Sequence, residues 1–466
     1  MTQTKHNTKA AIPPFGLRDK AGYLFGDFGN DFTFILSSSF MLKFYTDVMG
    51  ISGSVVGLLM MAARFLDAFT DVTMGQIVDR SKPTAYGKFR PWIRRMCGPV
   101  AISSFLIYQS AFASFPYAFK VFWMVVTYLL WGSIFYTSIN IPYGSMASAI
   151  SSDPKDRAEL STWRSAGATL AGLVIGVGTP IFAYETVNGN TVLSGPRMTI
   201  LAGIFSLFAI LCYLLCFSLV QERVEVPKNT QKLSLVHLFT NVFGNRALLG
   251  IIAAAICLLL AMLTMTGMSA YVFPNYYGSA SAQSLSSFLT SAATLAICAP
   301  LAVRMSLRFG KKEFCAVMCF FASIVFFLCL LVHPKSPYGY ILFFTAAYIG
   351  VGFFNTIIWA MITDVIDDAE VRNGIREDGT IYSVYSFARK LGQALSSGLV
   401  GVLLDVIGYS QSTAFEPQVV ESLFSLSCIA PAIGFLLTAL SLHFLYPLDK
   451  KQVESNTAIL AERRNS

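Results

Sequence analysis

Long apolar segments run through almost the whole chain, and they constrain its fold more than any other feature. Twelve of them lie near residues 21–48, 52–78, 92–113, 120–149, 161–184, 198–220, 247–274, 282–303, 314–332, 339–363, 380–406 and 421–446. An α-helix needs roughly 20 apolar residues to cross a bilayer. Only 13% of the residues are charged, whereas soluble domains carry about 25%. We therefore predict an all-α membrane protein with twelve transmembrane helices.

The basic residues predict how these helices are oriented. Nearly all of the 34 lysines and arginines fall on the side that both termini share, and Lys120, Arg197 and Lys335 fall on the other. Cytoplasmic connections are enriched in lysine and arginine. We therefore expect a multi-pass protein of the cell (inner) membrane with both termini in the cytoplasm. The net charge of +8 is explained by this orientation, and we predict no nucleic-acid partner and no obligate protein partner.

A central polar segment divides the chain into two halves of six spans. We predict an N-terminal tail at 1–20, a six-helix bundle at 21–220, a central loop at 221–246, a second bundle at 247–446 and a C-terminal tail at 447–466. The loops after the second and eighth spans both carry a Gly-Lys pair, Gly87-Lys88 and Gly310-Lys311, which indicates duplication. Duplicated halves in transporters place the substrate site near the membrane midplane, between the halves.

Charged residues in the second span predict a cation site. Arg64, Asp67 and Asp71 are spaced three and four residues apart, so they share one helix face. A charge at the centre of a span costs about 2.5–3.5 kcal/mol on insertion scales, so it requires a reason. Two carboxylates held together in a low dielectric favour a shared proton or a bound small cation such as sodium. The structural alternative is that Arg64 only neutralises Asp67 to lock the bundle, but this leaves Asp71 uncompensated.

Other polar and aromatic residues of the spans predict a substrate site. The candidates are Asp27, Asn30 and Asp31 in the first span, Tyr136, Thr137, Asn140 and Tyr143 in the fourth, Arg164 in the fifth, Asn355 and Trp359 in the tenth, and Tyr382 and Lys390 in the eleventh. Aromatic faces stack on sugar rings and polar groups bind hydroxyls. The alternatives are helix packing for the fourth span and snorkelling to the membrane surface for Arg164. We expect Lys390 to be the counter-charge of Asp67 and Asp71.

An acidic run, Asp364 to Glu370, follows the tenth span. We expect it to be a cytoplasmic loop whose charges help to close the inward side. It lacks the alternating ligands and central glycine of a calcium-binding loop. The nine cysteines and four histidines show no metal-ligand spacing, and the spans hold no catalytic or phosphate-binding motif. We therefore predict no enzyme activity and no cofactor.

Several of these motifs together resemble a known family. They are Gly26-Asp27-Phe28-Gly29-Asn30-Asp31, Phe44-Tyr45-Thr46-Asp47, Arg64 to Asp71, Gly87-Lys88-Phe89-Arg90-Pro91, Asn140-Ile141-Pro142-Tyr143 and Arg389-Lys390-Leu391-Gly392-Gln393. The chain is similar over residues 18–446 to the glycoside–pentoside–hexuronide:cation symporters, which include the melibiose permease and the glucuronide carrier. This family is a branch of the major facilitator superfamily, so the resemblance implies the major facilitator fold.

The resemblance also implies roles for individual residues. It assigns cation binding to Asp67, Asp71, Thr137 and Asn140, and sugar binding to Asp31, Asn30, Arg164 and Lys390. Asn140 stands where the melibiose permease has an acid, which weakens a sodium site and favours a proton. If sodium is the coupling ion, Asp67 and Asp71 are its ligands. Gly144 replaces a sugar-stacking tryptophan, and Arg164, Arg389 and Lys390 could favour an anionic sugar.

These features predict a secondary transporter that imports a sugar or glycoside with a proton or sodium ion, by alternating access. Two alternatives remain open from the residues. One is a carrier of another solute on the same scaffold, such as a lysolipid, although the polar lining favours a small hydrophilic solute. The other is a non-transporting sugar sensor.

Overall fold

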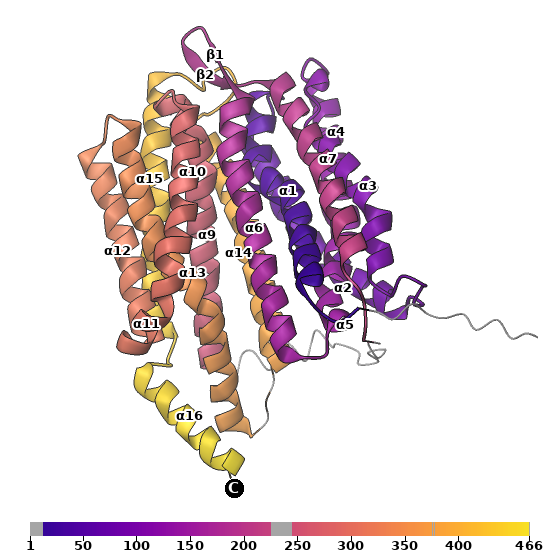
Figure 1. The fold of residues 1–466 in the computed structure, drawn as a ribbon. Helices are drawn as coiled ribbons and strands as arrows, with labels where there is room; N and C mark the ends of the chain where they lie inside the picture. Colours follow the sequence, from indigo (N-terminus) through magenta and orange to yellow (C-terminus); the bar gives the residue numbers. More distant parts are fainter. Residues whose placement is uncertain (1–12, 225–244, 375, 377, 466) are drawn as a thin grey trace, which may run out of the picture.

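The computed structural model describes residues 13–224, 245–374, 376 and 378–465, which form an almost entirely helical bundle (Figure 1). The first half contains α1 (Leu17–Asp47), α2 (Gly53–Arg80), α3 (Arg90–Ile107), α4 (Tyr117–Leu129), α5 (Thr137–Ile150), α6 (Pro154–Ala183) and α7 (Gly195–Leu219). The second contains α9 (Arg246–Tyr271), α10 (Ala280–Ala293), α11 (Ala299–Phe309), α12 (Lys311–Val332), α13 (Pro337–Asn373), α14 (Asp378–Val406), α15 (Pro417–Leu440) and α16 (Lys450–Asn465). Strands β1 (Tyr184–Val187) and β2 (Asn190–Leu193) form a hairpin between α6 and α7.

The described helices make twelve spans, as the apolar segments predict. A π-helical segment, Leu130–Tyr136, joins α4 to α5, and another, Thr294–Cys298, joins α10 to α11, so that each pair forms one span. Eight of the spans are apolar enough to be recognised by composition alone. The other four are α1, α2, α3 and α14, whose charged residues lower their mean hydropathy. Three of these four helices, α1, α2 and α14, carry predicted site residues, and the other predicted site residues lie on recognised spans.

The predicted duplication is visible in two equivalent turns. Gly87 precedes α3 with φ 104°, and Gly310 precedes α12 with φ 93°, a region that favours glycine. A carboxylate lies against each turn, because Glu222 accepts hydrogen bonds from the backbone N–H groups of residues 88–90 at 2.7–2.9 Å, and Glu313 lies beside Gly310. The glycine turn therefore recurs at equivalent positions of the two halves, although the carboxylate beside it follows α7 in the first half and belongs to α12 itself in the second.

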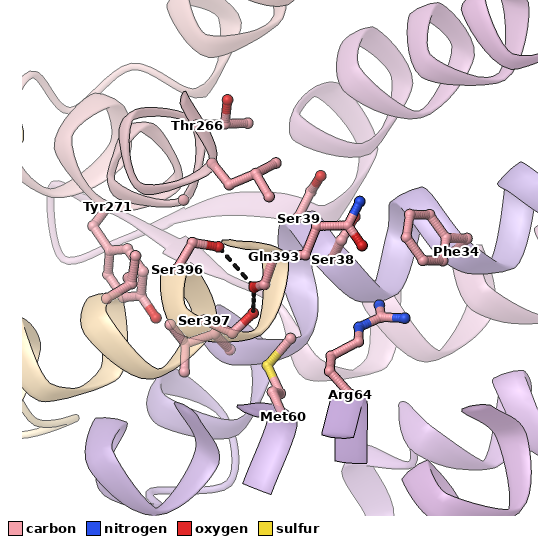
Figure 2. A pocket seen from close by; sticks show the side chains of 14 residues that line it. Phe34, Ser38, Ser39, Met60, Arg64, Thr266, Tyr271, Gln393, Ser396 and Ser397 are labelled. Carbon is pink, nitrogen blue, oxygen red and sulfur yellow. Dashed lines mark hydrogen bonds between the residues drawn. The ribbon is translucent and has the colours of Figure 1, made fainter. Parts of the chain in front are cut away.

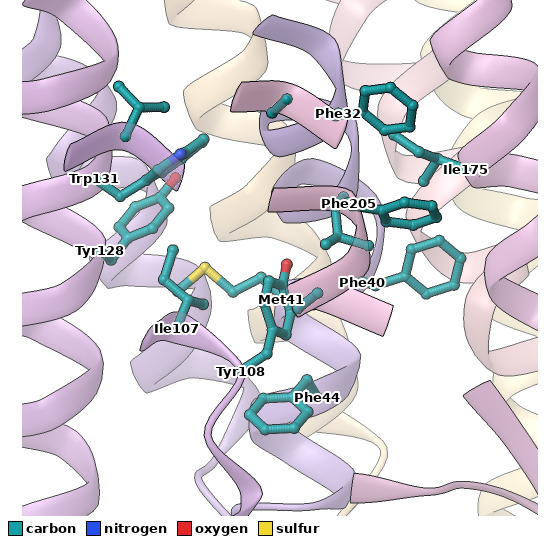
Figure 3. Close-up of a cluster of buried hydrophobic side chains, with 14 of the residues drawn as sticks. Phe32, Phe40, Met41, Phe44, Ile107, Tyr108, Tyr128, Trp131, Ile175 and Phe205 are labelled. Atoms are coloured by element: carbon teal, nitrogen blue, oxygen red, sulfur yellow. The ribbon is translucent and has the colours of Figure 1, made fainter. Parts of the chain in front are cut away.

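Each half is built around its own hydrophobic core. The first core includes Phe32, Met41, Tyr108 and Trp131, which are almost fully buried (Figure 3). This core extends into the second half through residues such as Tyr271 and Tyr409. Both of these tyrosines lie at the end of the bundle that carries the β1–β2 hairpin, which we call the hairpin face. The opposite end, where α1 begins and α16 ends, is the terminal face (Figure 1).

Hydrogen bonds between the halves cluster at the hairpin face. Asp405 of α14 accepts from the backbone N–H groups of Gly53 and Ser54 at 2.9 and 3.0 Å. Ser284 of α10 donates to the carbonyl of Val177 in α6 at 2.8 Å. Near the terminal face, Trp359 is 41% exposed and Tyr382 is 53% exposed. The halves are therefore closed at the hairpin face, and the space between them opens toward the terminal face.

Glycines allow α2 and α14 to approach closely at this closed end. A Cβ at Gly401 would lie 2.2 Å from the carbonyl oxygen of Gly53. We expect Gly401→Ala to lower the apparent Tm of the purified protein, since overpacking costs about 1–3 kcal/mol. The matched control is Gly75→Ala on α2, where a Cβ meets nothing within 4 Å and alanine favours the helix. An equal response of the two variants in a thermal melt would contradict this packing argument.

One expectation from the sequence needs correction. The run from Asp364 to Glu370 is not a loop, because α13 continues to Asn373. Its charges are paired within the second half: Asp364 with Lys311 at 2.6 Å, Asp367 and Glu370 with Arg376 at 2.8 and 2.7 Å, and Asp368 with Arg372 at 3.0 Å. These pairs brace the half and do not join it to the other half. Pairing on successive helical turns explains why the acidic run is helical.

The segments outside the predicted bundles are only partly described. Residues 1–12 of the predicted tail and 225–244 of the predicted central loop lie outside the described residues. In the C-terminal segment, α16 packs on the second half, where Asn456 is 2% exposed and donates to Asp368 at 3.0 Å. The β1–β2 hairpin was not predicted, because its four-residue strands carry no long alternating pattern.

Candidate functional site

A polar cavity of about 460 Å³ lies between the two halves. The first half contributes Asp27, Asp31, Phe34, Arg64, Asp67, Asp71, Tyr136, Thr137, Asn140, Arg164 and Ala168, and the second contributes Trp359, Ser386, Arg389, Lys390 and Gln393. Ten of the predicted site residues therefore lie around one cavity. Its position between the halves is where duplicated transporters place their substrate site.

The two acids of α2 are held by two hydroxyls of the fourth span. Ser133 donates to Asp67 Oδ1 at 2.7 Å, and Thr137 donates to Asp71 Oδ1 at 2.9 Å. Both pairs have four-residue spacing, so the two helices present matching faces. Ser133 and Tyr136 lie in the π-helical segment Leu130–Tyr136, and such wide turns are frequent at functional sites. The wide turn directs the hydroxyls toward the carboxylates.

Each of these acids also has a cationic partner. Arg64 Nη1 lies 3.5 Å from Asp67 Oδ2, and Lys390 of α14 forms an ion pair with Asp71 Oδ2. The predicted counter-charge contact is therefore confirmed for Asp71. It joins α2 to α14 across the interface between the halves. Among the described residues no group of three or more His, Cys, Asp or Glu side chains is placed to hold a metal ion.

Arg164 does not snorkel to the membrane surface but points to an acid of α1. Its Nε donates to Asp27 Oδ1 at 2.9 Å. We expected the sugar to lie between Asp31 and Arg164, yet the arginine is engaged by Asp27 one turn away. Asp31 also lines the cavity, but it has no hydrogen-bond or ion-pair partner among the described residues. Asp31 is therefore the carboxylate most available to a substrate.

Two predicted substrate residues lie behind the cavity wall. Asn30 is 1% exposed, accepts from the Tyr213 hydroxyl at 2.8 Å and donates to Asn140 at 3.4 Å. Tyr143 is 1% exposed, and its ring is stacked 4.6 Å from that of Tyr23. Neither lines the cavity, so in this conformation both position the residues that do.

The second half presents an aromatic surface with an arginine beside it. The rings of Trp359 and Tyr382 are stacked at a centroid distance of 5.4 Å. The Tyr385 ring meets the Trp359 ring edge-on at 5.0 Å, and Arg389 packs on both Trp359 and Tyr385. Stacked, half-exposed rings can bind the face of a sugar. Asn355, on the same helix as Trp359, does not line the cavity.

A smaller pocket of about 90 Å³ adjoins this cavity on the side of the hairpin face. Figure 2 shows the side chains that line it. It shares Phe34, Arg64 and Gln393 with the main cavity and reaches Tyr271. The Arg64 guanidinium lies 4.8 Å from the Phe34 ring centroid. The pocket is lined by both halves, and it ends beneath the contacts that close the hairpin face.

Sequence reasoning missed Ser133 and Phe34. Ser133 was detectable in principle, because it precedes Thr137 by four residues, the same spacing that separates Asp67 from Asp71. Phe34 gives no such signal, since an apolar residue in a span is ordinarily interpreted as packing.

Comparison with known proteins identifies the family. A family model described as "MFS/sugar transport protein" matches residues 22–450. The chain belongs to this family. A putative sulfoquinovose importer of Salmonella typhimurium is 31% identical, with 97% of this chain and 94% of the relative covered. A glucuronide carrier protein homolog of Escherichia coli is 27% identical, with 96% of each chain covered.

Solved structures show the same fold as this MFS/sugar transport protein. A bacterial homolog of the human lysosomal transporter Spinster, in an inward-facing and occupied conformation, superposes with a TM-score of 0.66. The two share 12% sequence identity, with 92% of this chain and 95% of the other covered. The predicted major facilitator fold and the resemblance to sugar symporters are thus confirmed.

Proposed function

We propose that this chain imports a sugar or glycoside in symport with a proton, by alternating access of the central cavity. The observation that carries the proposal is the ion pair between Lys390 and Asp71, because it places a titratable carboxylate in contact with both halves and beside the substrate cavity. In this proposal the chain lies in the inner membrane with both termini in the cytoplasm. The terminal face is then cytoplasmic, and the described conformation is open to the cytoplasm.

The coupling ion acts through Asp67 and Asp71. In the deprotonated state Asp71 is compensated by Lys390, and this pair holds α14 against α2. A proton on Asp71 removes the negative charge, so the attraction to Lys390 is lost and the halves are free to move. We favour a proton over sodium because the nearby Asn140 supplies no charge. Asp67 has the same kind of environment, with Ser133 and Arg64 as its neighbours.

The substrate binds between the halves. Asp31 supplies a carboxylate that accepts hydrogen bonds from sugar hydroxyls, and Trp359 supplies an aromatic surface. Tyr382 is not among the residues that line the cavity, and it supports the Trp359 ring by stacking on it. The names of the sulfoquinovose importer and the glucuronide carrier homolog support a sugar as the cargo. The charged lining of the cavity gives no support to a lysolipid.

Uptake into proteoliposomes tests this proposal. A panel of radiolabelled glycosides, pentosides and hexuronides is offered under a proton gradient and, separately, under a sodium gradient. We expect at least one sugar to accumulate under the proton gradient, and we expect Asp67→Asn to lose this accumulation. Accumulation driven by sodium alone would overturn the choice of ion. If no sugar moves under either gradient, sugar symport itself is wrong.

A further inference from the structure

An apolar groove of about 570 Å³ lies between α6 and α7, and it shares no lining residue with the cavity between the halves. Leu201 and Phe205 line this groove and are buried, whereas Ile181, Phe182 and Ile200 line it and are 54–64% exposed. The buried side chains therefore form its floor, and the exposed side chains form its rim. Because α6 and α7 are both long and apolar enough to cross a membrane, the rim faces the lipid chains.

A glycine leaves room within the groove. Gly178 of α6 lines it, and a Cβ at this position would meet no atom within 4 Å. Lipid chains are about as apolar as a leucine side chain, so a chain gains no hydrophobic free energy when it moves from the bilayer into the groove. The groove therefore fixes where a chain lies, and selection of one lipid over another must come from the polar headgroup.

The end of the groove at the hairpin face carries one base and one acid. Arg197, in the first turn of α7, lines the groove, and its side chain is 52% exposed. Its Nη1 donates to the carbonyl of Tyr184 at 2.9 Å, and its Nε lies 3.4 Å from Glu185 Oε2. Its Nη2 has no partner among the described residues. Glu185 belongs to β1, directly after α6 (Figure 1), so both charges lie where the membrane-spanning helices end.

These two charges match the two charges of a zwitterionic headgroup. A guanidinium binds phosphate oxygens through charge-assisted hydrogen bonds, and a carboxylate accepts hydrogen bonds from an ammonium group. The phosphate and the ammonium of one headgroup can therefore engage Arg197 and Glu185 while a chain of the same lipid occupies the groove. A phospholipid that lacks the ammonium leaves the Glu185 carboxylate uncompensated beside the phosphate.

We infer that this groove is a binding site for a phospholipid with a zwitterionic headgroup, such as phosphatidylethanolamine. Arg197 binds the phosphate, Glu185 accepts from the ammonium, and one acyl chain lies over Gly178. The bound lipid is not the cargo, because the groove lies outside the cavity between the halves.

Native mass spectrometry tests this inference by counting the lipids bound to the purified full chain in detergent micelles. The probes are phosphatidylethanolamine and phosphatidylglycerol with identical acyl chains, each titrated separately. We expect one molecule of the ethanolamine lipid to bind at least about 10-fold more tightly than the glycerol lipid, because a hydrogen bond to a charged group is worth about 1.5–3 kcal/mol.

Variants assign the binding to this groove. Arg197→Gln removes the phosphate contact and Gly178→Phe fills the groove, so each weakens the binding of both lipids about 10-fold or more. Glu185→Gln instead removes the preference for the ethanolamine lipid, and the glycerol lipid binds no more weakly than to the unmodified protein.

Two matched controls place the same changes elsewhere. Lys335→Gln removes a positive charge between α12 and α13, and Gly98→Phe adds a ring on α3 where a Cβ also meets nothing within 4 Å. Neither residue lines the groove, so we expect both variants to bind the two lipids as the unmodified protein does.

The inference is wrong if the unmodified protein binds the two lipids equally, or if Gly178→Phe binds them undiminished, since either result means that lipid only surrounds the protein without a site. A second copy of the chain retained in place of the lipid would also overturn it. If Arg197→Gln does not fold, Glu185→Gln and Gly178→Phe still decide the question. None of these measurements requires transport, so their outcome is independent of sugar symport.

Discussion

Asp71→Asn is expected to abolish gradient-driven accumulation while leaving downhill movement of the sugar intact. With one proton per sugar, a pH difference of one unit supplies about 1.4 kcal/mol, which supports about tenfold accumulation at zero membrane potential. The variant cannot carry the proton, so its accumulation ratio falls to about one. The amide resembles the protonated carboxyl, and it releases Lys390 without a proton. The empty and loaded protein therefore reorient alike.

Two measurements check this expectation in proteoliposomes. The first is the steady-state ratio of sugar inside to outside under an imposed pH gradient, and the second is equilibrium exchange of labelled for unlabelled sugar. Asp79→Asn is the matched control, because Asp79 lies on the same helix but is half-exposed, 3.8 Å from Lys88 and outside the cavity. Tenfold accumulation by Asp71→Asn would exclude Asp71 as the proton carrier.

A double variant separates uncoupling from damage to the fold. Asp71→Asn alone leaves Lys390 without its carboxylate, and an uncompensated charge within a membrane bundle is destabilising. Asp71→Asn with Lys390→Met removes both charges. We expect this double variant to be the more stable in a thermal melt and equally uncoupled. Recovery of accumulation in the double variant would show that the proton acts elsewhere.

The sequence was sufficient for the scaffold and for the acids, because both follow from local periodicity. Apolar length predicts the spans, and the spacing of Asp67 and Asp71 places them on one helix face. Partners far apart in sequence were harder to predict. Arg164 and Asp27 are separated by 137 residues, and no periodic pattern distinguishes Asp27 from Asp31 as the partner. The resemblance to known symporters favoured Asp31 as the sugar acid without revealing that it is unpaired.

The prediction that the acidic run after the tenth span is a loop was wrong for a different reason. Hydropathy places the end of this span where the charged residues begin. The helix nevertheless continues through them to Asn373, because their charges are paired. Lys311 and Arg376 supply these partners from neighbouring elements. The same logic applies to α1, α2 and α14, whose charges are tolerated because they face a cavity or another charge. Hydropathy therefore locates the helices that face lipid better than those that form the site.

A buried lysine contributes to closing the hairpin face, and its contacts with the second half were not predicted from the sequence. Lys43 of α1 is 1% exposed and pairs with Asp47 at 2.7 Å. It also donates to Asn275 at 2.6 Å and to the Tyr409 hydroxyl at 2.9 Å, both in the second half. Its ammonium lies 4.4 Å from the centroid of Tyr271, the residue that ends the small pocket above the cavity. Lys43 thus blocks the path from the cavity to the hairpin face.

Lys43→Met is expected to shift the protein strongly toward opening at the hairpin face. The variant loses the two hydrogen bonds that the ammonium donates to the other half. Hydrogen bonds to charged groups are worth about 1.5–3 kcal/mol each, so the two together correspond to roughly two to four orders of magnitude in an equilibrium between two states. The readout is modification of a cysteine introduced at Ser39, in the small pocket, by a membrane-impermeant thiol reagent added from the hairpin side. Eight of the nine native cysteines are buried, so their background reaction is small.

Lys120→Met is the matched control for Lys43→Met. Lys120 also lies at the hairpin face, but it donates to the carbonyls of Met49 and Ala113, both within its own half, at 2.5 and 3.4 Å. Its loss leaves the contact between the halves intact, so labelling at Ser39→Cys stays slow. Lys43→Met with Asp47→Asn removes both charges of the pair, and we expect fast labelling there too, because Asn275 and Tyr409 still lose the ammonium. Slow labelling in both Lys43 variants would mean that Asp405 and the packing of Gly53 against Gly401 hold the face closed without the lysine.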